Sequence, residues 1–183
     1  GEKIIAECKA SSGDASKLTE LFMQLTWAKI SDTSDTVLSP AESLVVLEAA
    51  QSVDETTPHF VASAGTAFVN IIGRRKVSRN IRSRLISEGC MELALKLLAA
   101  HTESELAVRC VLMMMMTLLE DGDEAQRLWV KNGGVELVLG LVQQYSPESP
   151  YDMHAKTDGP AVLYSNPKFI PAADLLEKAC HCL

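Results

Sequence analysis

The 183-residue sequence lacks the features that mark several large classes of protein. No apolar run approaches the roughly eighteen residues that a transmembrane helix needs, so we expect no membrane-spanning segment. The first fourteen residues contain no hydrophobic stretch typical of a signal peptide. Aromatic residues make up only 5% of the chain, whereas a β-sandwich would be rich in aromatic and β-branched residues. The remaining composition, 47% hydrophobic and rich in Leu, Ala, Val and Met, predicts packed helices in a soluble protein.

Motifs of catalysis and metal binding are also missing. The sequence contains no GxSxG, no P-loop lysine motif and no GxGxxG. Cys180, His181 and Cys182 lie too close together on one expected helix to meet a tetrahedral ion. Cys90 and Cys110 lie in apolar helical sequence, where we expect both to be buried as small hydrophobic residues, and the odd total of five cysteines favours a reducing compartment. We therefore expect a protein that is not an enzyme, binds no metal or cofactor and is intracellular, cytoplasmic with the nucleus as the alternative.

Helical periodicity dominates the sequence up to about residue 145. Asp14 is placed to cap a helix that runs to about Ile30, and Ser39-Pro40 is placed to begin a second helix that ends near residue 53. A third helix is expected from Pro58 to residue 72. Later helices are expected at 78–87, 91–100, 123–132 and 135–145, with another beginning at Thr102 or Glu103 and ending near 120. We expect no strand.

The C-terminal part of the chain differs in composition. Five prolines fall between residues 146 and 171, which predicts a long loop or insertion. A last helix is expected over 172–183. We thus divide one helical domain, 1–183, into N-terminal helices (14–57), a central part (58–145), the loop and the terminal helix. We also expect the chain to be part of a longer protein.

An internal repeat is visible in the central part. SRLISEGCMELALKLL (83–98) is similar to RLWVKNGGVELVLGLV (127–142) at an offset of 44 residues, and the longer helices at 62–73 and 109–120 are similar at an offset of 47. A period in the forties with three helices per unit is typical of an α-solenoid. Such units stack because one unit cannot cover its own apolar face.

These units resemble armadillo repeats over about residues 39–145. Gly89 and Gly133 match the break between the first two helices of a unit. The apolar pairs Leu97-Leu98 and Leu141-Val142 match the end of the second helix. The third-helix pattern is matched by Ala64, Asn70 and Ile71, with Thr66 at the family's Trp position, and in the next unit by Val111, Met113 and Thr117.

The resemblance implies an all-α, right-handed α-solenoid of about three to four repeats, with a rigid curved surface that binds proteins. Family members that bind extended basic peptides carry a ladder of Trp and Asn on this surface. Here only Asn70 is kept, and Trp27 and Trp129 lie elsewhere in the sequence, which argues against binding of nuclear import signals. The resemblance places partner contacts at Thr66, Asn70, Met113 and Thr117. Met113 is the member of the Met113–Met116 run that we expect in the groove, while core packing is expected for the run as a whole.

A basic stretch stands out against the acidic chain. GRRKVSRNIRSRL (73–85) holds six of the 17 basic residues in a chain with 24 acidic ones. It is either a solvated surface, a docking site for an acidic protein segment, phosphoprotein or phosphoinositide, or a nucleic-acid contact. The absence of aromatic residues from 73 to 98 and a pI near 5.1 argue against nucleic acid. The candidate docking residues are Arg74, Arg75, Lys76, Arg79 and Arg82.

The function expected from these features is that of a non-enzymatic interaction or scaffold module. Its partner would be a protein or peptide, acidic or phosphorylated, lying along a concave helical groove. The alternative is a structural spacer or assembly domain that packs within a larger protein. The oligomeric state is left open.

Overall fold

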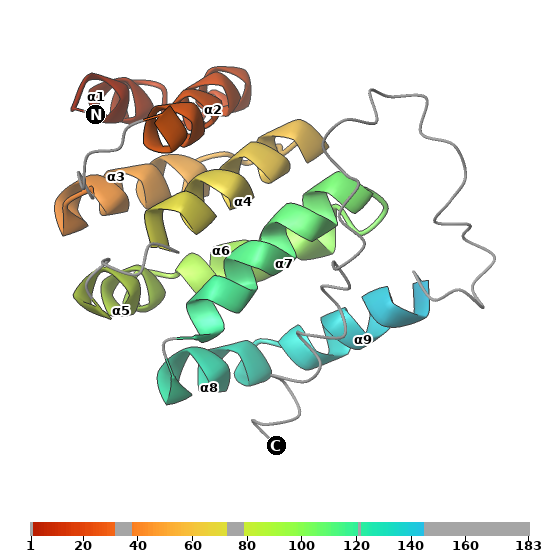
Figure 1. The fold of residues 1–183 in the computed structure, drawn as a ribbon. Coiled ribbons are helices and arrows are strands. Elements are labelled where there is room, and N and C mark those ends of the chain that lie inside the picture. Colours follow the sequence, from red (N-terminus) through yellow and green to blue (C-terminus); the bar gives the residue numbers. More distant parts are fainter. Residues whose placement is uncertain (1, 32–37, 73–78, 121, 145–183) are drawn as a thin grey trace.

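The computed structural model describes residues 2–31, 38–72, 79–120 and 122–144. Within these ranges the protein is all-helical, with nine α-helices and no strand (Figure 1). In chain order the helices are α1 (Glu2–Ala10), α2 (Ala15–Ser31), α3 (Pro40–Gln51), α4 (Pro58–Ile72), α5 (Arg79–Ser87), α6 (Cys90–Ala100), α7 (Glu105–Leu119), α8 (Asp123–Lys131) and α9 (Gly134–Gln144).

The expected helices from α2 to α9 are confirmed within a few residues. Helix α1 was not expected, because its nine residues bury only Ile5 and Cys8 and so show little periodicity. A helix this short is marginal by itself, and packing on α3 stabilises it. Helix α7 begins later than expected, because Ser104 is the residue that caps it. The expected loop at 146–171 and helix at 172–183 lie outside the described residues.

Three of the helices, α2, α4 and α7, begin with the same capping arrangement. The side-chain oxygen of Asp14, Thr57 or Ser104 accepts from the backbone N–H three residues later, at 2.9, 3.2 and 3.4 Å respectively. The backbone carbonyl of each cap accepts from the N–H four residues later. Each cap satisfies N–H groups that the first helical turn leaves without intrahelical partners. The caps therefore give a common origin from which positions in the three helices can be compared.

The three capped ends lie at the same side of the molecule. The Gly13 N–H donates to Ser52 Oγ at 2.8 Å, which joins the start of α2 to the α3–α4 connection. Thr56 Oγ1 lies 2.8 Å from His101 Nε2, which joins the start of α4 to the α6–α7 connection. Because α2 packs on α4 and α4 packs on α7, the three helices run parallel, with their first turns side by side (Figure 1).

The closest approach in this layer is between α4 and α7. A Cβ atom added to Gly65 would lie 2.9 Å from both the carbonyl carbon and the carbonyl oxygen of Cys110. Glycine is needed here because it lets the two backbones come this near. On its other side, α4 meets α2 through the rings of Phe60 and Phe22, whose centroids are 5.9 Å apart.

The 44-residue repeat appears in the structure as two equal helix–glycine–helix units, α5–α6 and α8–α9. Gly89 and Gly133 both have positive φ, at 91° and 79°, as a tight turn between helices requires. The carbonyl of each glycine accepts from the N–H four residues on, that of Leu93 and that of Leu137. The repeat found in the sequence is thus confirmed at the level of backbone geometry.

Side-chain volume is exchanged between the two units. At the positions of Leu85 and Cys90 in the first unit, the second has Trp129 and Gly134. The buried Trp129 ring fills the space of a side chain at Gly134, since a Cβ there would lie 1.8 Å from Nε1. The second unit thus combines a large residue, Trp129, with a small one, Gly134, where the first unit has two residues of intermediate size, and the interior is filled in both cases.

Candidate interaction face

The sequence-predicted positions on α4 and α7 occupy equivalent places along the parallel helices, counted from their caps, and we call each such set a row. Thr66 and Met113 are both nine residues after their caps, and Asn70 and Thr117 are both thirteen residues after them. Nine and thirteen residues after Asp14, helix α2 has Met23 and Trp27. The rows are therefore Met23–Thr66–Met113 and Trp27–Asn70–Thr117. We name the surface that carries them the α2–α4–α7 face.

The side chains of both rows reach solvent. Met23 is 50% exposed and Trp27 is 63% exposed, while the four row residues on α4 and α7 are half-buried. Trp27, which we expected to lie away from the candidate groove, is at the same distance from its cap as Asn70 and Thr117, and its side chain is exposed. Sequence comparison missed Met23 and Trp27 because α2 lies outside the best-matching units. Counting from the Asp14 cap would have found them.

A third row makes the face more apolar. Thr26, Val69 and Met116, twelve residues after the three caps, are all half-buried. The threonine hydroxyls of the face donate to carbonyls of their own helices, Thr66 to Ala62 and Thr117 to Met113, both at 2.8 Å. Since these hydrogens are already used, the threonines present mainly methyl groups and an acceptor oxygen.

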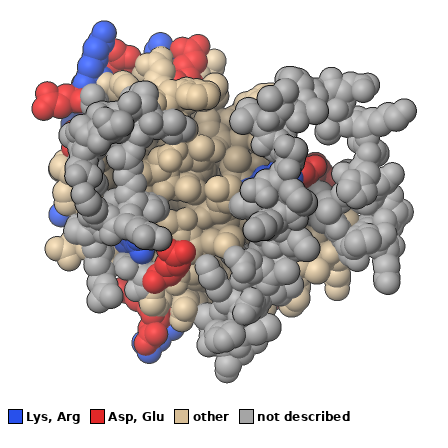
Figure 2. Space-filling model, viewed as in Figure 1, with Lys and Arg blue, Asp and Glu red and all other residues tan. Residues whose placement is uncertain are grey.

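The described part of this face that is visible at the centre of Figure 2 shows no charged side chain. In the view in which α7 lies in front of α6 (Figure 1), the described surface at the centre is free of Lys, Arg, Asp and Glu (Figure 2). The described charges nearest to the rows on α7 lie at its two ends: the Arg109 guanidinium forms an ion pair with Glu105 near the first turn, and Glu120 is the C-cap residue. An uncharged surface of Met, Trp, Thr and Val is suited to apolar side chains of a partner.

The methionine run divides between core and surface. Met114 and Met115 are fully buried, whereas Met113 and Met116 are half-buried. Core packing is thus confirmed for the middle pair, and Met113 does reach the candidate face. Cys90 is buried as expected, but Cys110 is only half-buried, and its Sγ lies 3.6 Å from Thr66 Oγ1.

The basic stretch is only partly described. Arg74, Arg75 and Lys76 lie outside the described residues, and of Arg79 the structure describes the backbone at the start of α5. The Arg82 Nε–H donates to the Ile72 carbonyl at 3.3 Å. This bond satisfies a carbonyl at the end of α4 and places a positive charge at the negative end of the helix dipole. Arg82 thus helps to hold the end of α4 next to the basic stretch, a role that the sequence did not reveal.

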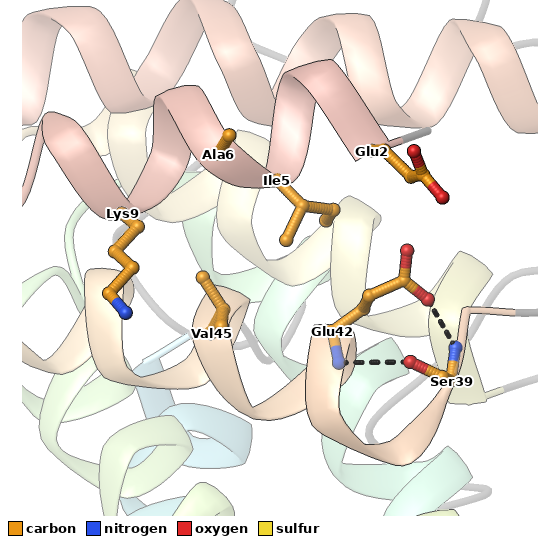
Figure 3. A pocket seen from close by; sticks show the side chains of 7 residues that line it. All are labelled: Glu2, Ile5, Ala6, Lys9, Ser39, Glu42 and Val45. Carbon is orange, nitrogen blue, oxygen red and sulfur yellow. Dashed lines mark hydrogen bonds between the residues drawn. The ribbon is translucent and has the colours of Figure 1, made fainter.

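A shallow hollow of about 490 Å³ lies between α1 and α3 (Figure 3). Its lining residues are Glu2, Ile5, Ala6, Lys9, Ser39, Glu42 and Val45. Ser39 and Glu42 form the capping box of α3: Ser39 Oγ accepts from the Glu42 N–H at 3.2 Å, and the Glu42 carboxylate accepts from the Ser39 N–H at 2.7 Å. Because these polar groups cap α3, the hollow does not present a converging set of reactive side chains.

Within the described ranges, no three His, Cys, Asp or Glu residues are grouped so that they could hold a metal ion. None of the described helices combines the length and apolar character needed to cross a bilayer. Comparison with protein families, with curated proteins and with solved structures gave no significant match.

Proposed function

We propose that the chain is a right-handed, armadillo-like α-solenoid of about three to four repeats that serves as a non-enzymatic protein-interaction module. The solenoid architecture in this proposal is supported by two repeat distances along the sequence. The helix pair α5–α6 is followed by the similar pair α8–α9 after 44 residues, and the Thr57 cap of α4 is followed by the Ser104 cap of α7 after 47 residues. The parallel packing of α2, α4 and α7 supports it further, since such layers form when similar units stack.

The observation that carries the interaction function is the pair of rows on the α2–α4–α7 face. Three helices that pack on one another carry Trp27, Met113 and the other row residues with their side chains at least partly exposed. A surface that is ordered before binding loses little conformational entropy when a partner lies across it. Exposed Trp is among the residues that contribute most at interfaces. The partner in this proposal is a protein or peptide segment with apolar anchors.

The basic stretch adds a preference for acidic or phosphorylated partners. In the sequence, the basic stretch follows directly after α4. The last turns of α4 carry Asn70, and Arg82 donates a hydrogen bond to the carbonyl at the end of this helix. A partner whose apolar anchors sit in the rows would bring acidic residues to this end. Attraction between exposed charges raises the association rate and is screened by salt. No cofactor takes part. The free, buried thiols of Cys8 and Cys90 suit a reducing, cytoplasmic setting.

The proposal is tested by capture of partners from a cell lysate with four matched baits, identified by mass spectrometry. The face variant is Trp27→Ala with Met113→Ala. The charge variant changes Arg74, Arg75 and Lys76 to Glu. The control, Glu48→Ala with Lys96→Ala, changes two exposed residues in α3 and α6. Circular dichroism confirms folding of each bait.

We expect one set of proteins to be retained by wild type and control and lost by the face variant. Acidic members of this set should be weakened by the charge variant and by added salt. If the face variant retains all partners of the wild type, the rows are not the binding surface.

Direct binding can be followed through tryptophan, because the chain has one exposed and one buried indole. Trp27 is 63% exposed and Trp129 is fully buried. A partner peptide that covers Trp27 should shift its emission to shorter wavelength. The same peptide should leave the emission of a Trp27→Phe variant unchanged.

The alternative, a structural spacer or assembly domain, is favoured by one observation. Leu139 and Val130, on α9 and α8, are 45% and 37% exposed, an apolar surface that a neighbouring element would cover. A domain of this kind would capture no partner through the α2–α4–α7 face and would self-associate through the α8–α9 end.

A further inference from the structure

The two ends of the helix stack differ in polarity. Three residues after its cap, α2 has the exposed Lys17, where α4 and α7 have the buried Phe60 and Ala107. Ten residues after its cap, α2 has the exposed Gln24, where α4 and α7 have buried Ala67 and Met114. At these two positions α2 is polar and exposed where the inner helices are apolar and buried, whereas the exposed apolar residues of α2, Met23 and Trp27, lie on the α2–α4–α7 face. The α1–α2 end is built to face water, as the terminal unit of a stack must be.

The α8–α9 end shows the opposite pattern. Leu139 is 45% exposed, but Leu95, its equivalent 44 residues earlier, is 6% exposed. Val130 is 37% exposed, and its equivalent Ile86 is 3% exposed. Half-buried residues of α9 likewise correspond to buried residues of α6: Val135 to Met91, Leu137 to Leu93 and Val142 to Leu98. In the first unit, α7 and α8 pack on α6, whereas among the described helices α9 packs mainly on α8.

The exposed set therefore belongs to a unit whose third helix is missing from the described residues. The chain continues for 39 residues after α9, and twelve of them have the pattern of an amphipathic helix. Over 172–183 the apolar residues recur at spacings of three and four, at Ala172, Leu175, Leu176, Ala179, Cys180 and Leu183. The other six positions are Ala173, Asp174, Glu177, Lys178, His181 and Cys182, of which four are polar. A twelve-residue helix is about 18 Å long, which matches the eleven residues of α9.

We propose that residues 172–183 cover the exposed apolar face of α8–α9 within the same molecule, in the position that α7 takes on α6. Leu175, Leu176 and Leu183 supply the apolar side that packs on Leu139 and its neighbours. The segment then closes the second end of the stack and turns its polar side outward, as α2 does at the first end. With the end closed, the domain has no remaining apolar surface there for a neighbouring domain or a second copy.

The test is a photo-crosslink in the full chain. p-Benzoylphenylalanine replaces Leu139, and in a control protein it replaces Lys96, which is exposed on α6. Mixing ordinary and isotope-labelled chains before irradiation separates crosslinks within one molecule from those between copies. We expect a crosslink from position 139 to a peptide within 172–183 of the same molecule, and none to this segment from position 96.

Two variants probe the sides of the segment. Leu175→Glu with Leu176→Glu should abolish the crosslink, while Lys178→Glu, on the polar side, should retain it. Amide hydrogen exchange in α9 should quicken on the order of tenfold or more in the first variant, with no change in α2, α4 and α7. A crosslink to a second copy, to another part of the chain, or with equal yield from position 96 would overturn the proposal, as would the absence of any crosslink to 172–183.

Discussion

The contact between α4 and α7 gives a sharp prediction for Gly65→Ala. In most helix interiors this change stabilises a protein by about 1 kcal/mol, because alanine has the higher helix propensity. Here the new Cβ would lie 2.9 Å from two backbone atoms of Cys110. A backbone contact cannot be relieved by turning a side chain, so α4 and α7 must move apart. Overpacking of this kind costs about 1–3 kcal/mol, with a tight double contact at the upper end.

We therefore expect Gly65→Ala to lower the free energy of unfolding by about 1–2 kcal/mol after the gain in propensity is subtracted. For a chain of this length, Tm should fall by about 3–6 °C. The movement also separates Thr66 from Cys110, whose Oγ1 and Sγ lie 3.6 Å apart, and so loosens the row spacing of the α2–α4–α7 face.

Gly140→Ala is the matched control. Gly140 lies exposed in α9, and a Cβ there would meet no atom within 4 Å. The same substitution should raise the free energy of unfolding by about 0.5–1 kcal/mol, because only the propensity remains. Urea denaturation followed by circular dichroism measures both. If Gly65→Ala is as stabilising as Gly140→Ala, the two helices are not held at the distance that the structure shows.

Three further predictions concern the rest of the fold. Gly134→Cys and Trp129→Leu should each lower the free energy of unfolding by about 2–3 kcal/mol. The double variant copies the residues of the first unit and should be about 1–3 kcal/mol more stable than the sum of the two single losses predicts, as a double-mutant cycle measures. Strictly additive losses would contradict the exchange of volume. Ser39→Ala should lower stability by about 1 kcal/mol through loss of the capping box, measured by urea denaturation; no loss would mean that Pro40 alone sets the start of α3. Burial and, secondly, the Glu7 carboxylate raise the pKa of the Cys8 thiol from 9.0 to about 11. Folding stability should therefore decline as pH rises from 9 to 11, less so in Cys8→Ala, and rapid alkylation of Cys8 at pH 8 in the folded protein would contradict its burial.

The cap residues show why most helices were predictable from the sequence. Asp14, Ser39 and Pro40 act within three or four residues of their own positions, so the sequence alone shows where α2 and α3 begin. The start of α7 was placed early because Thr102, Glu103 and Ser104 are all plausible near a helix start. Only the bond from the Ala107 N–H to Ser104 Oγ separates them.

The candidate face was partly predictable. Thr66, Asn70, Met113 and Thr117 were chosen from the repeat, and all four are half-buried in the structure. Their role in binding stays a prediction. Trp27 was assigned to a place away from the candidate groove, because the sequence around it does not show which helix α2 will pack against. The bond between Gly13 and Ser52 and the ring contact between Phe22 and Phe60 place α2 beside α4 only in the folded chain.

By itself, the sequence determined the all-helical class, most of the helix ends and the 44-residue repeat, because propensity, capping and periodicity act over a few neighbouring residues. The tertiary structure alone decided which helices lie side by side and which faces remain open. It showed that Gly65 is a contact point, that Arg82 holds the end of α4, and that Leu139 is exposed where Leu95 is buried. These properties depend on contacts between residues in different helices or on the neighbour that a helix lacks, and neither is encoded in the pattern of a single helix.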